Sequence, residues 1–396
     1  MRQAATGGQR SLFRPADPGI GAAERFMPVW ETDPMQPAPA PGPDGGPPAG
    51  GAPDGGDRLA WTREGTYQVA PGVYRIPLPL PFDGLRAVNV YAVESSDGLT
   101  LIDSGWVQAA TRDLLERSLR SIGAGFGDIR RFLITHVHRD HYTQAIALRE
   151  VFGTPVALGA DEKASLDALL SKRFRLLSAQ ADRLAAAGAE ELLRELEQAG
   201  LNRSQEVLDY AEPDEWIGAG QVFDLGDRTL EAIATPGHTR GHLVFADRAA
   251  GLLFAGDHVL PHITPSIGFE AVPPPLPLRD FLESLRLVRR MPDLALLPAH
   301  GPVGPSVHAR VDELLDHHEA RLAAMTRGLA DGVRTAYQVA GELRWTSRDR
   351  RLTELDPLNQ VLAVCETECH LDLLVSRGLA AARVAEGVRR YQLIAA

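Results

Sequence analysis

One short stretch restricts the fold of this chain more than any other: Thr135-His136-Val137-His138-Arg139-Asp140-His141. Residues 132–134 precede it as an apolar run, which predicts a buried strand over residues 131–135. Side chains two apart in an extended segment point the same way, so His136 and His138 can converge on one point while Asp140 and His141 serve a second. Imidazole nitrogens and carboxylate oxygens are ligands of zinc and similar metals. The stretch therefore predicts a metal site rather than a polar turn.

Three further apolar runs each end beside one more candidate ligand. Residues 230–234 lead to His238, residues 252–254 to Asp257, and residues 294–297 to His300. Glycine or proline stands at each of these points and permits tight turns and close backbone approach. The chain thus places single His and Asp residues in loops that follow predicted strands.

The seven positions resemble the metallo-β-lactamase superfamily, whose pattern is H-x-H-x-D-H followed by a lone His, a lone Asp and a lone His. The resemblance spans about residues 60–325 and implies an α/β fold, the four-layer αββα sandwich. It implies that His136, His138 and His238 bind a first metal, that Asp140, His141 and His300 bind a second, and that Asp257 bridges them. The implied cofactor is two Zn²⁺ ions, with Mn²⁺ or Fe²⁺ as alternatives.

Composition and periodicity divide the chain into three parts. Residues 1–57 are rich in proline and glycine, which predicts a disordered tail. Residues 58–325 form the expected catalytic domain, with strands at 72–76, 88–93 and 99–102 and helices at 111–122 and 145–152. A helical insertion at about 163–211 has two interpretations: a lid over the substrate, or a helical pair packed on the core. Asp103 resembles the family's strand-end Asp, which braces the metal loop.

The third part, residues 326–396, resembles a winged-helix module. Helices are predicted at 335–343 and 361–378, and Glu386-Gly387 marks a hairpin between two short strands. Nucleic-acid binding needs a basic stripe, but the would-be recognition helix carries Glu366, Glu368 and Asp372. Packing or homodimer formation is the favoured role.

Composition also restricts location and partners. The net charge of −11 argues against a polyanionic partner, and two cysteines in 396 residues indicate a reducing, cytoplasmic compartment. No apolar run approaches the length of about 18 residues that a membrane span needs, and the N-terminus lacks the apolar segment of a signal peptide. The expected partner is a small-molecule substrate.

The expected chemistry is hydrolysis by a metal-bridging hydroxide. Asp140 is predicted to orient the attacking water or accept its proton, and His258, next to the bridging Asp257, to handle protons. Tyr142 and His262 are predicted to border the substrate, whereas His242 is assigned to orienting or packing.

Several substrate classes compete. A carbonyl ester, thioester or lactone is favoured because the protein is acidic. A metal-dependent phosphodiesterase or endoribonuclease is the alternative, since the layout resembles the β-lactamase-like protein 2 type. A regulatory winged-helix binding module is the third, although it would not need seven ligands.

Overall fold

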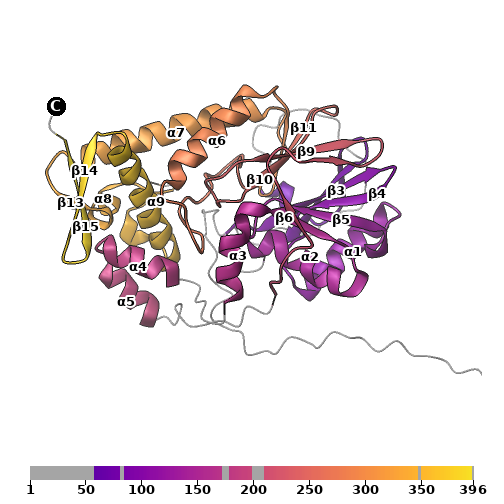
Figure 1. The fold of residues 1–396 in the computed structure, drawn as a ribbon, viewed down its shortest axis with the longest axis horizontal. Helices are drawn as coiled ribbons and strands as arrows, with labels where there is room; N and C mark the ends of the chain where they lie inside the picture. Colours follow the sequence, from indigo (N-terminus) through magenta and orange to yellow (C-terminus); the bar gives the residue numbers. More distant parts are fainter. Residues whose placement is uncertain (1–57, 81–83, 172–177, 199–208, 347–348, 395–396) are drawn as a thin grey trace, which may run out of the picture.

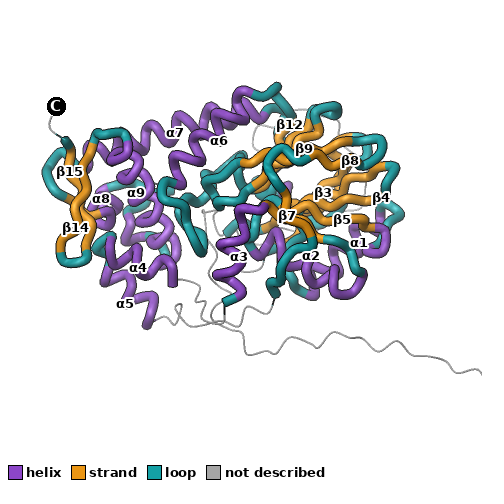
Figure 2. Tube along the Cα trace, in the orientation of Figure 1, coloured by secondary structure: helices purple, strands orange, loops and turns teal. Residues whose placement is uncertain are grey.

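The structure is a computed structural model that describes residues 58–80, 84–171, 178–198, 209–346 and 349–394. The predicted tail, residues 1–57, lies outside the described residues. Two β-sheets stacked face to face form the centre of the larger part of the molecule, and helices cover the outer face of each (Figure 1). A smaller, mainly helical part adjoins them (Figure 2).

The first sheet contains seven strands in sequential order, and its second half is parallel. These strands are β1 (Tyr67–Ala70), β2 (Val73–Pro79), β3 (Ala87–Ser95), β4 (Gly98–Ile102), β5 (Ile129–Ile134), β6 (Val156–Gly159) and β7 (Glu215–Ile217). The second sheet has the order β12-β11-β10-β9-β8. Its strands are β8 (Val222–Asp224), β9 (Thr229–Ala234), β10 (Leu243–Asp247), β11 (Leu252–Gly256) and β12 (Ala295–Pro298).

Three buried apolar clusters correspond to the three interfaces between four layers. The middle cluster joins the sheets, with Tyr91 of β3 packing edge-on against Phe254 of β11 at 5.4 Å between ring centroids. A second cluster lies between the first sheet and its helices, and a third lies between the second sheet and its own. The covering helices are α1 (Ala109–Ser121), α2 (Arg139–Phe152) and α3 (Lys163–Leu170) on the first sheet, and α6 (Pro277–Arg290) and α7 (Val307–Gly328) on the second. The predicted αββα sandwich is confirmed, because each sheet buries both faces.

The insertion packs in two different places. Helix α3 lies on the first sheet, whereas α4 (Ser178–Ala186) and α5 (Glu190–Gln198) lie against α9 (Pro357–Ser376) near the C-terminus (Figure 1). Gly188, with a φ of +77°, separates α4 from α5. Leu192 and Leu196 of α5 are buried in the same cluster as α9. For α4 and α5, the structure therefore agrees with the packed helical pair rather than with a lid.

The C-terminal unit combines α8 (Ala336–Glu342) and α9 with a three-stranded sheet of order β13-β15-β14. Its strands are β13 (Arg334–Thr335), β14 (Ala380–Ala385) and β15 (Val388–Leu393). The predicted hairpin is present, with positive φ at Glu386 and Gly387. The winged-helix assignment itself stays a prediction.

Helix α9 is surrounded by protein rather than exposed. Helices α4, α5, α6, α7 and α8 all contact it. Glu368 is buried and accepts a hydrogen bond from Arg183 of α4 at 2.7 Å, and Asp372 accepts one from Arg389 of β15 at 2.9 Å. The acidic residues that the sequence placed on a would-be recognition helix thus form internal contacts. Across the described ranges, no helix has the length and apolar composition needed to cross a bilayer.

Candidate metal centre

Five of the seven candidate ligands lie in four loops at strand ends. Strands β9, β11 and β12 run in the same direction, because β10 is antiparallel to both β9 and β11 while β12 is parallel to β11. Their ends therefore bring His238, Asp257 and His300 to one edge of the sheet. The fourth loop follows β5 and supplies His136 and His138.

The two remaining candidate ligands, Asp140 and His141, lie in a helix. This helix starts earlier in the chain than the predicted helix at 145–152. Helix α2 begins at Arg139, so Asp140 and His141 occupy its first turn. Periodicity missed the first two turns of α2 because most of their residues are polar, although residues 140–144 are buried in the structure. A carboxylate in the first turn also interacts favourably with the helix dipole.

Four ligands form a first group. His138 Nδ1 lies 2.9 Å from His136 Nε2 and 3.1 Å from His238 Nε2. Asp257 Oδ2 completes the group at 3.5 Å from His238 Nε2. Every ligand atom of this group lies within 4.8 Å of the others. Zinc–nitrogen bonds of about 2.0–2.1 Å require ligand atoms this close together.

Asp140, His141 and His300 form a second group. Asp140 Oδ2 lies 3.4 Å from both His141 Nε2 and His300 Nε2. The other oxygen of Asp257, Oδ1, lies 3.3 Å from His300 Nε2 and 3.7 Å from His141 Nε2. The two carboxylate oxygens of Asp257 therefore face different groups.

Buried atoms of the second group lack hydrogen-bond partners among the described residues. They are Asp140 Oδ2, His141 Nε2 and His300 Nε2, together with Asp257 Oδ1, which faces this group. Buried polar atoms are nearly always paired, so four unpaired atoms that converge need another partner. Three imidazole or carboxylate donors with a shared carboxylate fit a divalent cation.

Hydrogen bonds on the outer side fix the orientation of the imidazoles. Carbonyl oxygens only accept, so His238 Nδ1–H donates to Ser266 and His300 Nδ1–H donates to Ala87, at 2.9 and 2.7 Å. His141 Nδ1 lies 2.8 Å from Asp103 Oδ2, and His136 Nδ1 lies 3.0 Å from Thr135 Oγ1. Each of these rings thus turns its Nε2 toward the cluster.

Asp103 connects the two groups from outside. Besides contacting His141, its carboxylate accepts hydrogen bonds from the backbone N–H and the hydroxyl of Thr135, at 2.8 and 3.0 Å. Its φ of +60° is unusual for a residue other than glycine and directs the carboxylate at the loop. Asp103 therefore has the bracing contacts that the sequence predicted.

His242 supports the loop of Asp257. Its Nδ1 lies 2.9 Å from Thr235 Oγ1, and its Nε2 accepts the backbone N–H of Asp257 at 3.1 Å. Gly256 has a φ of +51°, and a Cβ there would lie 2.7 Å from His242 Nε2. Only glycine allows this contact without a shift.

Burial and neighbouring charges set the protonation of the cluster. Burial lowers the pKa of His138 to about 4 and lowers the pKa of His136 and His238 well below the usual value. Burial also acts to lower the pKa of His141, but Asp140, Asp103 and Asp257 outweigh it and raise that pKa well above the usual value. Most imidazoles are therefore neutral and able to bind a cation.

The predicted substrate and proton-handling residues occupy different surroundings. The side chain of Tyr142 is buried in the cluster beneath the first sheet, and its hydroxyl donates to Ala211 O at 2.7 Å. Burial leaves Tyr142 no exposed surface for a substrate. His258 is fully buried between His242 and Phe281, at ring-centroid distances of 6.1 and 5.2 Å. His262 is exposed.

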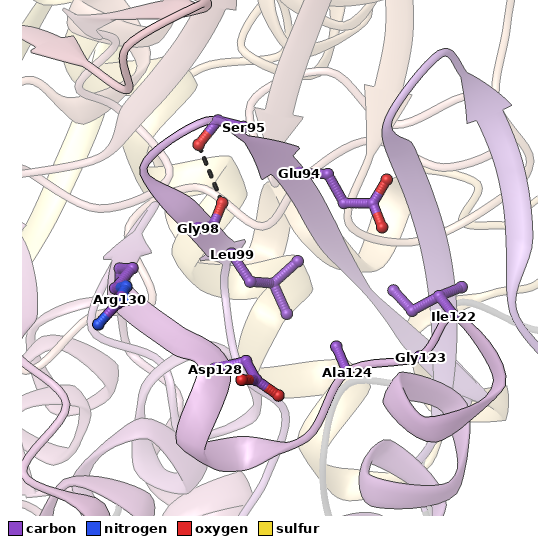
Figure 3. Close-up of a pocket in the computed structure, with 9 residues that line it drawn as sticks. All are labelled: Glu94, Ser95, Gly98, Leu99, Ile122, Gly123, Ala124, Asp128 and Arg130. Carbon is purple, nitrogen blue, oxygen red and sulfur yellow. Dashed lines mark hydrogen bonds between the residues drawn. The ribbon is translucent and has the colours of Figure 1, made fainter.

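A groove elsewhere on the molecule is separate from this centre. It has a volume of about 320 Å³ and lies between the β3–β4 turn and the segment that leads into β5 (Figure 3). Leu99 and Arg130, which line it, stand at the starts of β4 and β5, whereas the ligand loops follow the strand ends. The groove therefore lies at the opposite edge of the first sheet.

The fold and the clustered donors define a metal-binding protein of the αββα class. Within that class, the chain belongs to the metallo-beta-lactamase superfamily, because the family profile matches residues 83–300, more than half of the chain. This is a superfamily of metal-dependent hydrolases.

Relatives and solved structures agree with this membership. The chain is 27% identical over 317 residues to "Probable metallo-hydrolase YqjP" of Bacillus subtilis, covering 76% of this chain and 92% of that protein. It is also similar to a metallo-beta-lactamase family protein of Thermus thermophilus (27% identity, TM-score 0.63, covering 83% of this chain and all of that one). A beta-lactamase domain protein of Burkholderia ambifaria gives 28% identity and a TM-score of 0.70, covering 83% of this chain and 94% of that one.

Proposed function

We propose that this protein is a hydrolase with two divalent metal ions, zinc in the first instance, that cleaves a carbonyl ester, thioester or lactone. The observation that carries the proposal is Asp257, whose Oδ2 faces His238 at 3.5 Å while its Oδ1 faces His300 at 3.3 Å. A carboxylate that presents one oxygen to each of two ligand groups suits a pair of cations. The five imidazoles favour zinc, with Mn²⁺ and Fe²⁺ as alternatives.

The side chains of this centre would hold the metal ions and offset their charge. His136, His138 and His238 would hold one ion, and Asp140, His141 and His300 the other. Bound there, divalent cations supply Lewis acidity, which activates water and polarises the scissile carbonyl. Asp257 offsets the repulsion between two like charges, since its negative charge lies between the groups.

Proton handling is proposed for Asp140. Burial acts to raise its pKa, but His141 and His300 outweigh burial, and its pKa lies below the usual range. Asp140 is therefore ionised and can accept a hydrogen bond from the attacking water. Participation of His258 and contact of His262 with the substrate stay predictions. The exposure of His262 agrees with such a contact, whereas the burial of His258 favours packing.

The surroundings of α9 support a small substrate over a nucleic acid. A winged-helix reader needs a free helix, but α9 is covered by other helices and its Glu366 and Glu368 are buried. The net charge of −11 also disfavours a polyanion. A second copy of the chain remains the proposed partner for the C-terminal unit, and sedimentation would test it.

A hydrolysis screen tests this proposal. The zinc-loaded protein is assayed against thioesters, lactones, bis-p-nitrophenyl phosphate and RNA, with Asp257→Ala as the inactive control. We expect the zinc-loaded protein to hydrolyse an acyl substrate and the Asp257→Ala variant to show no hydrolysis of it. Cleavage of RNA or the phosphodiester alone would replace the acyl assignment by the phosphodiesterase alternative.

A further inference from the structure

A buried carboxyl group outside the ligand set is hydrogen-bonded to one loop of the first group and lies near the other. Glu162 ends the 3₁₀ turn η4 (Ala160–Glu162), which follows β6, and its side chain is fully buried. Its Oε1 accepts a hydrogen bond from the hydroxyl of Thr239, the neighbour of His238. The backbone N–H of Val137, which stands between His136 and His138, lies near the same carboxyl group and acts to lower its pKa, whereas Glu162 Oε2 has no hydrogen-bond partner among the described residues.

The backbone of the η4 turn packs tightly against the backbone of the His238 loop. A Cβ on Gly241 would lie 2.2 Å from the backbone nitrogen of Glu162 and 2.6 Å from its Cγ. A Cβ on Gly159 would lie 2.3 Å from the carbonyl oxygen of Gly241. Glycine at both positions lets the η4 turn and the His238 loop touch directly, so a shift of one would displace the other.

A second buried carboxylate binds the same loop. Glu270 Oε2 accepts from the backbone N–H of Arg240 at 3.0 Å and from the hydroxyl of Ser165 at 3.3 Å. Burial, followed by the charge of Glu270, raises the pKa of Glu162 to about 8. Two neighbouring buried carboxyl groups are an expensive arrangement for packing alone, which apolar side chains would achieve at lower cost.

We propose that Glu162 is a positioning residue, which ties the His136–His138 loop to the His238 loop so that their three imidazole nitrogens converge. This inference rests on the proposed metal centre but not on the substrate. The ligands of the second group depend on other contacts: His141 on Asp103, and His300 on Ala87. Loss of Glu162 should therefore lower the metal affinity of the first group and leave that of the second group unchanged.

Three variants separate positioning from packing. Glu162→Ala removes the acceptor, Glu162→Gln keeps one acceptor oxygen, and Leu166→Ala creates a cavity at a fully buried residue of α3 outside the ligand set. Zinc affinity is measured by chelator competition, the ligand geometry by the visible spectrum of the Co²⁺ form, and the apo-protein stability by thermal melting in chelator.

For Glu162→Ala we expect one tight metal instead of two, a 10–100-fold loss of affinity at the weakened site, and an altered Co²⁺ spectrum. Glu162→Gln should recover most of the affinity, and Leu166→Ala should bind two metals despite a lower apo melting temperature. Unchanged affinities and an unchanged spectrum in Glu162→Ala would overturn the positioning role.

A second route tests the same contact if Glu162→Ala does not fold. Thr239→Val removes the donor hydroxyl at nearly constant volume and should weaken the same single site. If Thr239→Val binds zinc at both sites with the affinity of the wild type, the positioning role of Glu162 is refuted. A wild-type protein that takes up no zinc would instead refute the metal centre, so the two failures are distinguishable.

Discussion

The substitution Asp103→Asn tests how one residue outside the ligand set supports both metal groups. Asparagine keeps the size of the side chain and tolerates the φ of +60° at this position, so the backbone should not change. It replaces one acceptor oxygen by an NH₂ donor. The native carboxylate accepts hydrogen bonds from Thr135 and contacts the ring Nδ1 of His141 at the same time. The NH₂ group of asparagine would face another donor on one of these two sides, so one of the contacts would be lost.

The expected magnitude follows from these contacts. Removing an outer partner of a metal-bound histidine costs about 10–100-fold in metal affinity, or about 1.4–2.7 kcal/mol. His141 contacts Asp103 directly at 2.8 Å, so the second site should lose the full amount. His136 contacts it through the Thr135 hydroxyl, so the first site should lose about tenfold or less.

Zinc affinities measured by chelator competition on the wild type, Asp103→Asn and Thr135→Val check this reasoning. Thr135→Val is the matched control, because it removes only the hydroxyl that faces His136 and should weaken the first site alone. Two wild-type affinities in Asp103→Asn would show that the outer hydrogen bonds do not orient the ligands.

Asp257→Ala should lose turnover and release metal at both groups, because it removes the oxygens that face each; an active variant with two metals by elemental analysis would contradict the bridging role. His258→Ala should keep both metals and melt at a lower temperature with turnover nearly unchanged, since burial lowers the pKa of this residue to about 3; a fall in turnover of roughly 10²–10⁴ at unchanged stability would restore the proton-handling role. The metal-free protein should lose stability as the pH falls from about 6.5 toward 3. Burial lowers the pKa of His370 to about 3, so the unfolded chain binds protons first, and each such histidine contributes about 1.4 kcal/mol per pH unit. Urea unfolding of His370→Gln should show a shallower pH dependence, and equal slopes would refute this assignment. Finally, fluorescence anisotropy should detect no tight, salt-sensitive binding of RNA or DNA, because α9 is buried; such binding would overturn the packing role of the C-terminal unit.

The sequence by itself determined the features that depend on local pattern. The chemistry and order of the seven candidate ligands, and the strands that precede four of them, follow from residue type and apolar runs. The hairpin at Glu386-Gly387 also follows from local signals. The start of α2 did not, because its first turns are polar and show no apolar period.

Tertiary structure decided what depends on contacts between distant segments. Glu162 meets Thr239 across 77 residues, and Arg183 of the insertion meets Glu368 of α9 across 185. No local pattern marks either pair, since an isolated Glu or Arg in a helical stretch is typical of a solvated surface. The burial of Tyr142 and the ring nitrogen that each histidine turns inward were fixed in the same way. Side-chain direction in this centre depends on partners that only the folded chain brings within reach.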